Sequence, residues 1–148
     1  MKFLSKILLG VFIPVSIFAS VQSKSLSDFR WHHRILLLPS VTASQSTQKP
    51  IDWHHYAAQL NDREMLVFRQ HKNKPSTYDQ IFPQTKQAVT VTVDQKLTKK
   101  IANSIALIGK DGHLKYTFPA QQKEDDAMLE NVFKIVDKMP MRQMGSGR

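Results

Sequence analysis

Short runs of apolar residues recur along the chain and predict the strands of a buried sheet. Continuous runs of four residues, bounded by polar or turn-forming residues, are typical of strands that are covered on both faces. An alternating β-branched run, and another alternating run after an Asp-Gly turn, predict two more strands. The continuous runs are residues 35–38, 65–68 and 105–108, and the alternating runs are residues 88–93 and 114–118.

Stretches with helical spacing lie between these runs. Pro50 can open a helix whose apolar residues recur three and four positions apart as far as Asp62. Asp94 can cap a short helix before the third continuous run. The clearest helix covers residues 124–138, because acidic residues occupy its first turn and lysines its last, and Pro140 is expected to stop it.

The order of these elements predicts the fold class. Residues 71–87 contain two prolines and many polar residues, so they are expected to form a connection rather than a strand. The rest reads strand, helix, strand, then a helix, a β-hairpin and a last helix. A right-handed crossover would make the first two strands parallel. This is the order of a thioredoxin-like α/β fold, a three-layer sandwich with a central mixed sheet.

The first 23 residues are interpreted as a signal peptide. Lys2 and Lys6 precede 13 almost wholly apolar residues, 7–19, whereas a membrane-spanning helix needs about 20. Cleavage is expected after Ala19 or after Ser23, with an uncleaved anchor as the alternative. The expected organisation is a signal peptide at 1–23, one domain at 24–142 and a flexible tail at 143–148, in a periplasmic or secreted protein.

Composition restricts the chemistry. The chain has 148 residues and no cysteine, so thiol nucleophiles, iron–sulfur clusters and thiolate zinc sites are excluded. Of its 21 lysines and arginines, removal of Lys2 and Lys6 leaves 19 against 12 acidic residues, a net charge of +7. This charge permits contact with anionic lipids, polysaccharide or nucleic acid, but the basic residues are dispersed, which also suits simple solubility.

Three segments, in this order, resemble a family of exported bacterial proteins known only as a domain of unknown function. They are residues 29–31 (FRW) with 34–37 (RILL), residues 107–112 (LIGKDG) with Lys115, and residues 137–142 (DKMPMR). That family is related to the peroxiredoxin-like domains of animal extracellular sushi-repeat proteins. The resemblance covers about residues 26–142, although residues 40–98 add no distinctive motif. It implies a thioredoxin-like fold without an established activity.

Two departures from catalytic relatives bear on function. Active thioredoxin-like enzymes carry a reactive cysteine just after the first core strand, where residues 39–44 here read PSVTAS. They also carry a proline before the third core strand, where residues 102–104 read ANS. The resemblance therefore brings no catalytic residue onto this chain, and no cofactor or metal is expected.

Arg30, Trp31 and Arg34 form the first candidate binding group. On a strand entrance, Arg30 and Arg34 would lie on one side and Trp31 on the other. One interpretation is a cationic surface for an anionic partner. The other is an amphipathic cover over the sheet edge with Trp31 in the core, since tryptophan is mostly buried in domains of this size.

Met139, Met141 and Arg142 form the second candidate group. Methionine is adaptable and common at pliable contacts, so this segment is either a docking edge for a partner or a packed end of the last helix. With both groups, the sequence favours a non-catalytic thioredoxin-like binding or structural module. Its partner would be a protein or an anionic envelope component, with no specific nucleic acid, and with membrane contact only through the signal segment before cleavage.

Two alternatives remain open. One is a non-thiol enzyme, hydrolytic or metal-assisted, in the cleft after the first strand, where Ser40 and Ser44 lie. Those serines have no obvious base, and the six histidines show no metal-binding spacing. The other alternative is a basic envelope polyanion binder, which rests on net charge alone.

Overall fold

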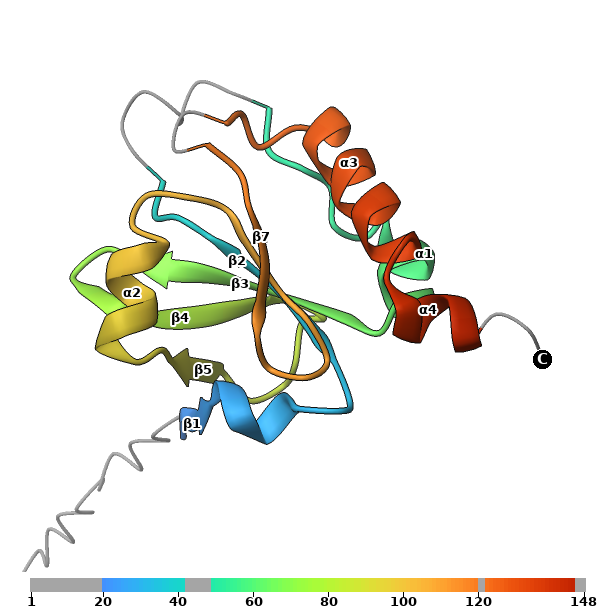
Figure 1. The fold of residues 1–148 in the computed structure, drawn as a ribbon. Coiled ribbons are helices and arrows are strands. Elements are labelled where there is room, and N and C mark those ends of the chain that lie inside the picture. The colour runs from blue at the N-terminus through green and yellow to red at the C-terminus, as the bar shows by residue number, and fades with distance from the viewer. Residues whose placement is uncertain (1–19, 42–48, 120–121, 146–148) are drawn as a thin grey trace, which may run out of the picture.

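The computed structural model describes residues 20–41, 49–119 and 122–145, which form one mixed sheet with helical segments on both sides (Figure 1). The strands are β1 (Gln22–Ser25), β2 (Arg34–Leu38), β3 (Met65–His71), β4 (Lys74–Phe82), β5 (Val89–Thr92), β6 (Ala106–Ile108) and β7 (Leu114–Thr117). The helical segments are η1 (Leu26–Phe29), α1 (Ala57–Asp62), α2 (Gln95–Lys100), α3 (Asp126–Asp137) and α4 (Pro140–Gly145). Within these ranges no helix is long and apolar enough to cross a membrane. Most of the predicted signal peptide, residues 1–19, lies outside them.

The strand order is β1-β5-β4-β3-β2-β6-β7. β2 pairs in parallel with β3 across the α1 crossover, and β6 pairs antiparallel with β2 on the other side. β7 returns from β6 as an antiparallel hairpin. The expected parallel pair and closing hairpin are therefore present, and β4, β5 and β1 widen the sheet beyond β3.

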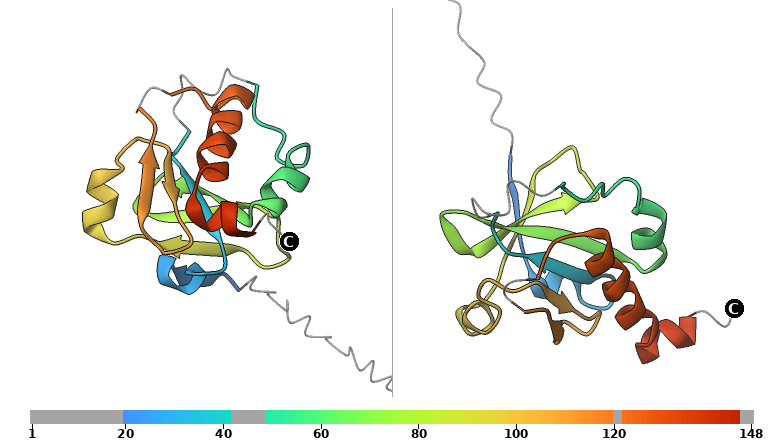
Figure 2. Two further views of the ribbon diagram at one scale, coloured as in Figure 1. Left: turned by 45° about the vertical axis from the view of Figure 1, so that its right-hand side comes forward. Right: turned by 90° about the horizontal axis from the view of Figure 1, so that it is seen from above.

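Alternation along β2 explains why its side chains are all buried. Leu36 and Leu38 point to the face that α1 and α3 cover, whereas Ile35 and Leu37 point to the face that α2 and η1 cover. Figure 2 shows α1 and α3 on one side of the sheet and α2 on the other. Two hydrophobic cores thus lie back to back, and a strand between them must be apolar at every position.

The prediction that residues 71–87 form a connection is wrong. β4 occupies most of this segment and lies inside the sheet, antiparallel to both β3 and β5. Its apolar anchors are few, mainly Tyr78 and Phe82, which are both buried. Backbone hydrogen bonds to two neighbouring strands hold β4 in place. Its side chains therefore show little of the apolar–polar alternation from which a strand is predicted.

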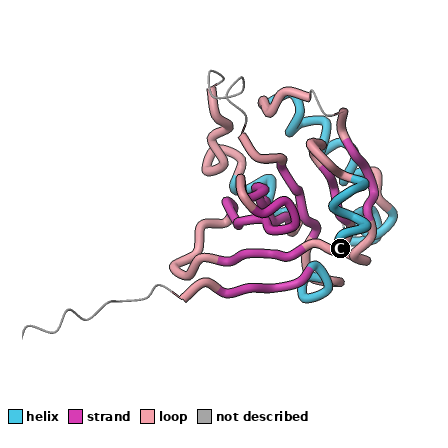
Figure 3. Tube along the Cα trace, turned by 90° about the vertical axis from the view of Figure 1, so that its left-hand side faces the viewer, coloured by secondary structure: helices cyan, strands magenta, loops and turns pink. Residues whose placement is uncertain are grey.

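The sequence pattern predicts no strand at the position of β1. β1 forms an edge strand that pairs in parallel with β5, and Figure 3 shows the two running side by side. Every β1 residue is polar, because its outer edge and most of its side chains face solvent. Hydrogen bonding to β5 therefore holds this strand.

The helix ends differ in detail from the expectations. α1 begins only at Ala57, because the Asp52 carboxylate holds the His54 and His55 amides in a turn before it. α2 begins after Asp94 as predicted, and the Asp94 carboxylate accepts a hydrogen bond from the Leu97 amide.

The last helix ends before its predicted stop. α3 ends at Asp137, and Pro140 begins α4 instead of closing the preceding helix, since proline is favoured in a first helical turn. α4 extends through residues 143–145, which the sequence assigned to a tail.

Candidate functional site

Topology brings the three motif segments to one end of the sheet. β6 runs antiparallel to β2, so the turn after β6 lies beside the start of β2. α3 starts at the far end, after β7, and returns to this end, where the junction with α4 lies. Segments some 75 to 110 residues apart in sequence therefore meet around Arg34, and we call this region the Arg34 end.

Arg30 and Trp31 rest on the β6–β7 turn. The Arg30 Nε donates to the Asp111 carbonyl at 3.1 Å, and the Trp31 amide donates to the Lys110 carbonyl at 2.5 Å. Gly112 has a φ of 80°, and a Cβ there would lie 2.9 Å from Arg30 Cγ. Glycine is thus required both for the turn and for the approach of Arg30.

Trp31 is not a core residue. Its side chain is 60% exposed, and its backbone has a φ of 69°, which is left-handed. The interpretation with Trp31 in the core is wrong, because this backbone conformation turns the chain before β2 begins. Arg30 lies 5.8 Å from the indole ring centre and faces it as a cation–π partner. Arg30 and Arg34 do not share a strand face, since β2 begins only at Arg34.

Arg34 is buried, with 2% of its surface exposed. Its Nη1 donates to the Arg63 carbonyl at 2.8 Å. Burial lowers the pKa of the guanidinium. The Glu64 carboxylate is the main opposing influence on this pKa, followed by a smaller lowering from Arg142 and a still smaller raising effect of Asp137. No carboxylate of the described residues lies within ion-pair distance of Arg34.

Two adjoining pockets open beside Arg34, and we call them together the Arg34 pocket. One has a volume of about 240 Å³ and the other of about 380 Å³, and Arg34, Lys110 and Met141 line both. Met139 and Pro140 add an apolar wall to the first, which Asp111 and Lys115 also line, and Asp62, Glu64 and Arg142 line the second. Four of the six predicted binding residues therefore lie around one space, and Arg30 and Trp31 contact the turn that borders it.

The other cations that line the Arg34 pocket have carboxylate partners. Lys110 pairs with Glu64, and this contact lowers the pKa of the Glu64 carboxyl. Arg142 pairs with Asp62 and lies 3.6 Å from Asp137.

Two further pairs complete the charge pattern of the Arg34 end. Lys115 pairs with Asp111, whose burial would raise the carboxyl pKa, but the lysine and the His113 amide outweigh it and lower the pKa. Arg63 holds Asp137 in a bidentate pair at 3.0 and 2.8 Å.

Sequence reasoning missed several residues that line this pocket, among them Lys110 and Glu64. Lys110 belongs to the LIGKDG motif but was interpreted only as part of a turn. Glu64 has no signal in the sequence, because its role depends on the β6–β7 turn folding back beside the start of β3. Its φ of 51° places it in the left-handed region before that strand.

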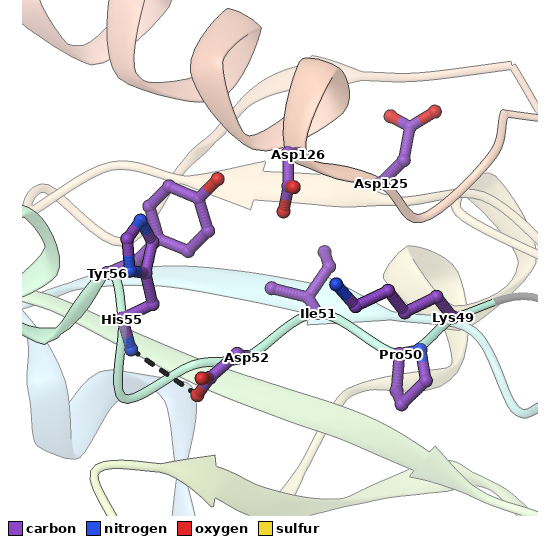
Figure 4. A pocket seen from close by; sticks show the side chains of 8 residues that line it. All are labelled: Lys49, Pro50, Ile51, Asp52, His55, Tyr56, Asp125 and Asp126. Carbon is purple, nitrogen blue, oxygen red and sulfur yellow. Dashed lines mark hydrogen bonds between the residues drawn. The ribbon is translucent and has the colours of Figure 1, made fainter.

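A second pocket lies at the opposite end of the sheet, in the region that follows β2 (Figure 4). Its volume is about 340 Å³, and its residues are Lys49, Pro50, Ile51, Asp52, His55, Tyr56, Asp125 and Asp126. The Tyr56 hydroxyl points toward Asp126 in Figure 4, and burial together with this carboxylate raises the Tyr56 pKa. A phenol with a raised pKa stays protonated at neutral pH, so this pocket offers a hydrogen-bond donor rather than a nucleophile.

The serine proposed for a hydrolase lacks a catalytic base. The Ser40 amide donates to Gln70 at 3.4 Å, and no histidine or carboxylate in the described ranges bonds the Ser40 hydroxyl. Ser44 lies outside those ranges. Within them, no group of three histidine or acidic side chains is placed to hold a metal ion.

The architecture and the lack of cysteine define a thioredoxin-like domain that cannot perform thiol chemistry. The chain is similar in structure to the mitochondrial 2-Cys peroxiredoxin of Plasmodium falciparum, with a TM-score of 0.50 and 12% identity over 83% of this chain and 84% of that one. The predicted fold class is thus confirmed. A weaker match, at a TM-score of 0.35 and 20% identity, is an exposed lipoprotein thioredoxin (Etrx1) of Streptococcus pneumoniae, covering 74% of this chain and 89% of that one.

The chain belongs to the family described as a domain of unknown function, DUF4174, whose model matches residues 25–144. The resemblance to a family without an assigned function is therefore confirmed. No curated protein matches the sequence.

Proposed function

We propose that this protein is a non-catalytic thioredoxin-like binding module of the periplasm or extracellular space, and that it engages its partner at the Arg34 end. The observation that carries the proposal is the meeting of the three motif segments around one pocket. Trp31 stands exposed beside that pocket, and exposed aromatic and arginine side chains are typical anchors of binding surfaces. The chain has no cysteine to place at the opposite end, where related enzymes carry their thiol, and Ser40, the candidate serine of the described ranges there, has no base.

A site-specific photocrosslinker tests this proposal in cells that make the protein. Met141 is exposed beside the pocket, and Lys99 is exposed on α2, on the other face of the sheet. A crosslinker at position 141 should give a discrete adduct that is lost when Trp31→Ala is added, and a crosslinker at position 99 should not. Equal adducts at both positions, or none at 141, would contradict the proposal.

Export is tested separately by fractionation. The full-length chain should yield a shortened protein in the periplasm or medium, as expected for a cleaved signal segment. Recovery of the uncut chain in the membrane fraction would favour the anchor, and recovery of the uncut chain in the cytoplasm would refute export. Neither result alters the crosslinking test.

The polyanion alternative has less support. Carboxylates alternate with the cations at the Arg34 end, so an extended polyanion would meet repulsion beside each attraction. The enzyme alternative rests on the contact between Tyr56 and Asp126 in the second pocket. Hydrolysis of generic esters that is lost in Tyr56→Phe would favour it over the binding module.

A further inference from the structure

We infer that the Arg34 pocket binds a single anionic oxygen group, carboxylate or phosphate, that is attached to a short apolar chain. The inference rests on the proposed function and names the chemistry of its ligand. Arginine is almost never fully buried without an ionic partner, because removing its charge from water is costly. Arg34 is buried and has one carbonyl partner. Among the described residues no carboxylate lies within ion-pair distance of it, and Glu64 attracts it only without direct contact. A bound anion would therefore supply a charge in direct contact with the guanidinium.

The Arg34 guanidinium has donors beyond the one that bonds Arg63. Among the described residues, one of its nitrogens donates to the Arg63 carbonyl and no second hydrogen bond engages the others. In the described part of the chain, no fully buried side-chain nitrogen lacks a partner. The remaining Arg34 nitrogens are therefore not fully enclosed, and Arg34 lines both pockets, where a guanidinium can bind a carboxylate or phosphate in bidentate fashion.

Charges around the pocket limit the ligand to one anionic group. Lys110 and Arg142 can add donors, because their partners Glu64 and Asp62 have side chains that are 53% and 60% exposed. Exposed pairs of this kind are weak and can yield to a competing anion. The same two carboxylates would repel a second anionic group.

Part of the pocket lining is apolar. Met139, Pro140 and Met141 form this part, and methionine side chains adapt to flexible chains. The larger of the two pockets, at about 380 Å³, already falls within the range of small-ligand sites, which begins at about 300 Å³. An anion with a tail of a few carbons can contact both Arg34 and the apolar residues, whereas a bare inorganic ion can contact only Arg34.

Isothermal titration of the folded domain at constant ionic strength tests the inference. The probes are hexanoate, hexyl phosphate, inorganic phosphate and hexanol, so that head group and tail are varied separately. We expect hexanoate or hexyl phosphate, or both, to bind, inorganic phosphate to bind at least about tenfold more weakly, and hexanol not to bind. The preferred head group identifies the ligand source as a carboxylic acid or a phosphate ester.

Variants locate the binding. Arg34→Met should weaken the preferred probe by at least about tenfold, and Arg34→Lys, which keeps the charge but not the planar fork, should weaken it less. Lys99→Gln removes one positive charge from the distant α2 surface and should leave affinity within about twofold, because exposed charges are screened. Equal affinity in Arg34→Met and the wild type would overturn the inference, and so would the absence of binding by either tailed anion.

A measurement on the wild type does not depend on a variant that folds. Amide shifts in NMR spectra should change on titration at Gly109, Lys110 and Met141, and not along α2. Changes confined to α2 or to the second pocket would overturn the inference. If a partner is crosslinked but none of the anions binds, only this inference is refuted. If an anion binds but no partner is crosslinked, only the proposed macromolecular partner is refuted.

Discussion

Replacing Arg34 by methionine should leave the ligand-free protein as stable as the wild type, or more stable. Methionine keeps most of the aliphatic volume of arginine and removes the charge. The substitution therefore separates the two roles that a buried arginine can have. Loss of a structural arginine would lower the free energy of unfolding of the ligand-free protein. Loss of a ligand-binding arginine should lower only the affinity for the ligand.

The magnitude follows from the contacts of Arg34. The variant loses one charged hydrogen bond to the Arg63 carbonyl, which is worth about 1.5–3 kcal/mol. It also removes the desolvation cost of a buried charge with no ion-pair partner, which is several kcal/mol in real proteins. The difference ranges from about zero to about 2 kcal/mol in favour of methionine. For a domain of this size, each kcal/mol raises Tm by about 4 °C.

Arg69→Met is the matched control, because the same substitution there should have the opposite sign. Arg69 holds Glu124 in a bidentate pair at 2.9 and 2.7 Å and also donates to the Pro39 carbonyl. Its loss leaves Glu124, whose side chain is 15% exposed, without its partner. We expect a loss of about 2 kcal/mol, reduced from the cost of breaking a fully buried pair because both side chains reach solvent.

Urea unfolding, followed by circular dichroism, gives both free energies of unfolding. The wild type and both variants are compared in a buffer without carboxylate or phosphate, so that no anion occupies the pocket. A loss in Arg34→Met that equals or exceeds the loss in Arg69→Met would refute the reasoning, because it would make Arg34 a structural residue. Addition of the preferred tailed anion should then stabilise the wild type and Arg69→Met, and leave Arg34→Met unchanged.

Three further predictions concern other parts of the fold. Trp31→Gly should be about 1 kcal/mol more stable than Trp31→Ala in thermal unfolding, the reverse of the usual loop order, because the φ at this position is left-handed; an equal or higher Tm for alanine would contradict the backbone geometry. Asp125→Ala should cost about 1 kcal/mol in urea unfolding, because the Asp125 carboxylate caps α3 at the Met128 amide, and no change would show that the cap does not stabilise the helix. Burial lowers the pKa of His33 below 6.5, so its contribution to stability is complete above pH 6.5 and is lost as pH falls; His33→Asn should flatten the fall in Tm on acidification, and an unchanged pH profile would exclude His33 as its source.

Much of the fold could be predicted because its central elements carry strong local signals. β2 and β3 are continuous apolar runs, since both of their faces are buried. α3 shows its cap and its apolar stripe in sequence, because a helix satisfies its backbone locally. β1 and β4 have no such signal. β1 pairs with β5, which is distant in the chain, and its polar side chains suit a sheet edge. β4 follows β3 directly, but backbone pairing on both sides holds it while many of its side chains stay polar.

The residues of the Arg34 end could be selected from the sequence, but their arrangement could not. Arg63 and Asp137 are 74 positions apart, and Arg142 and Asp62 are 80 apart. No local pattern pairs such residues. The prediction that Trp31 is buried failed for another reason. Tryptophan is usually buried, but the left-handed backbone of Trp31 itself turns the chain just before β2.

The pairing of β1 with β5 has a consequence for aggregation. Residues 88–93 read AVTVTV, an uncharged, β-branched segment of the kind that assembles edge to edge when exposed. β1 covers that edge with a polar strand containing Lys24. A processing cut after Ala19 would leave all four registered pairs, whereas a cut after Ser23 would leave only the last two, Lys24 with Val91 and Ser25 with Thr92. If the predicted signal segment is cleaved, the choice between the two cleavage positions would therefore decide how much of the β5 edge stays covered. The shorter product would expose this aggregation-prone edge to other copies of the protein.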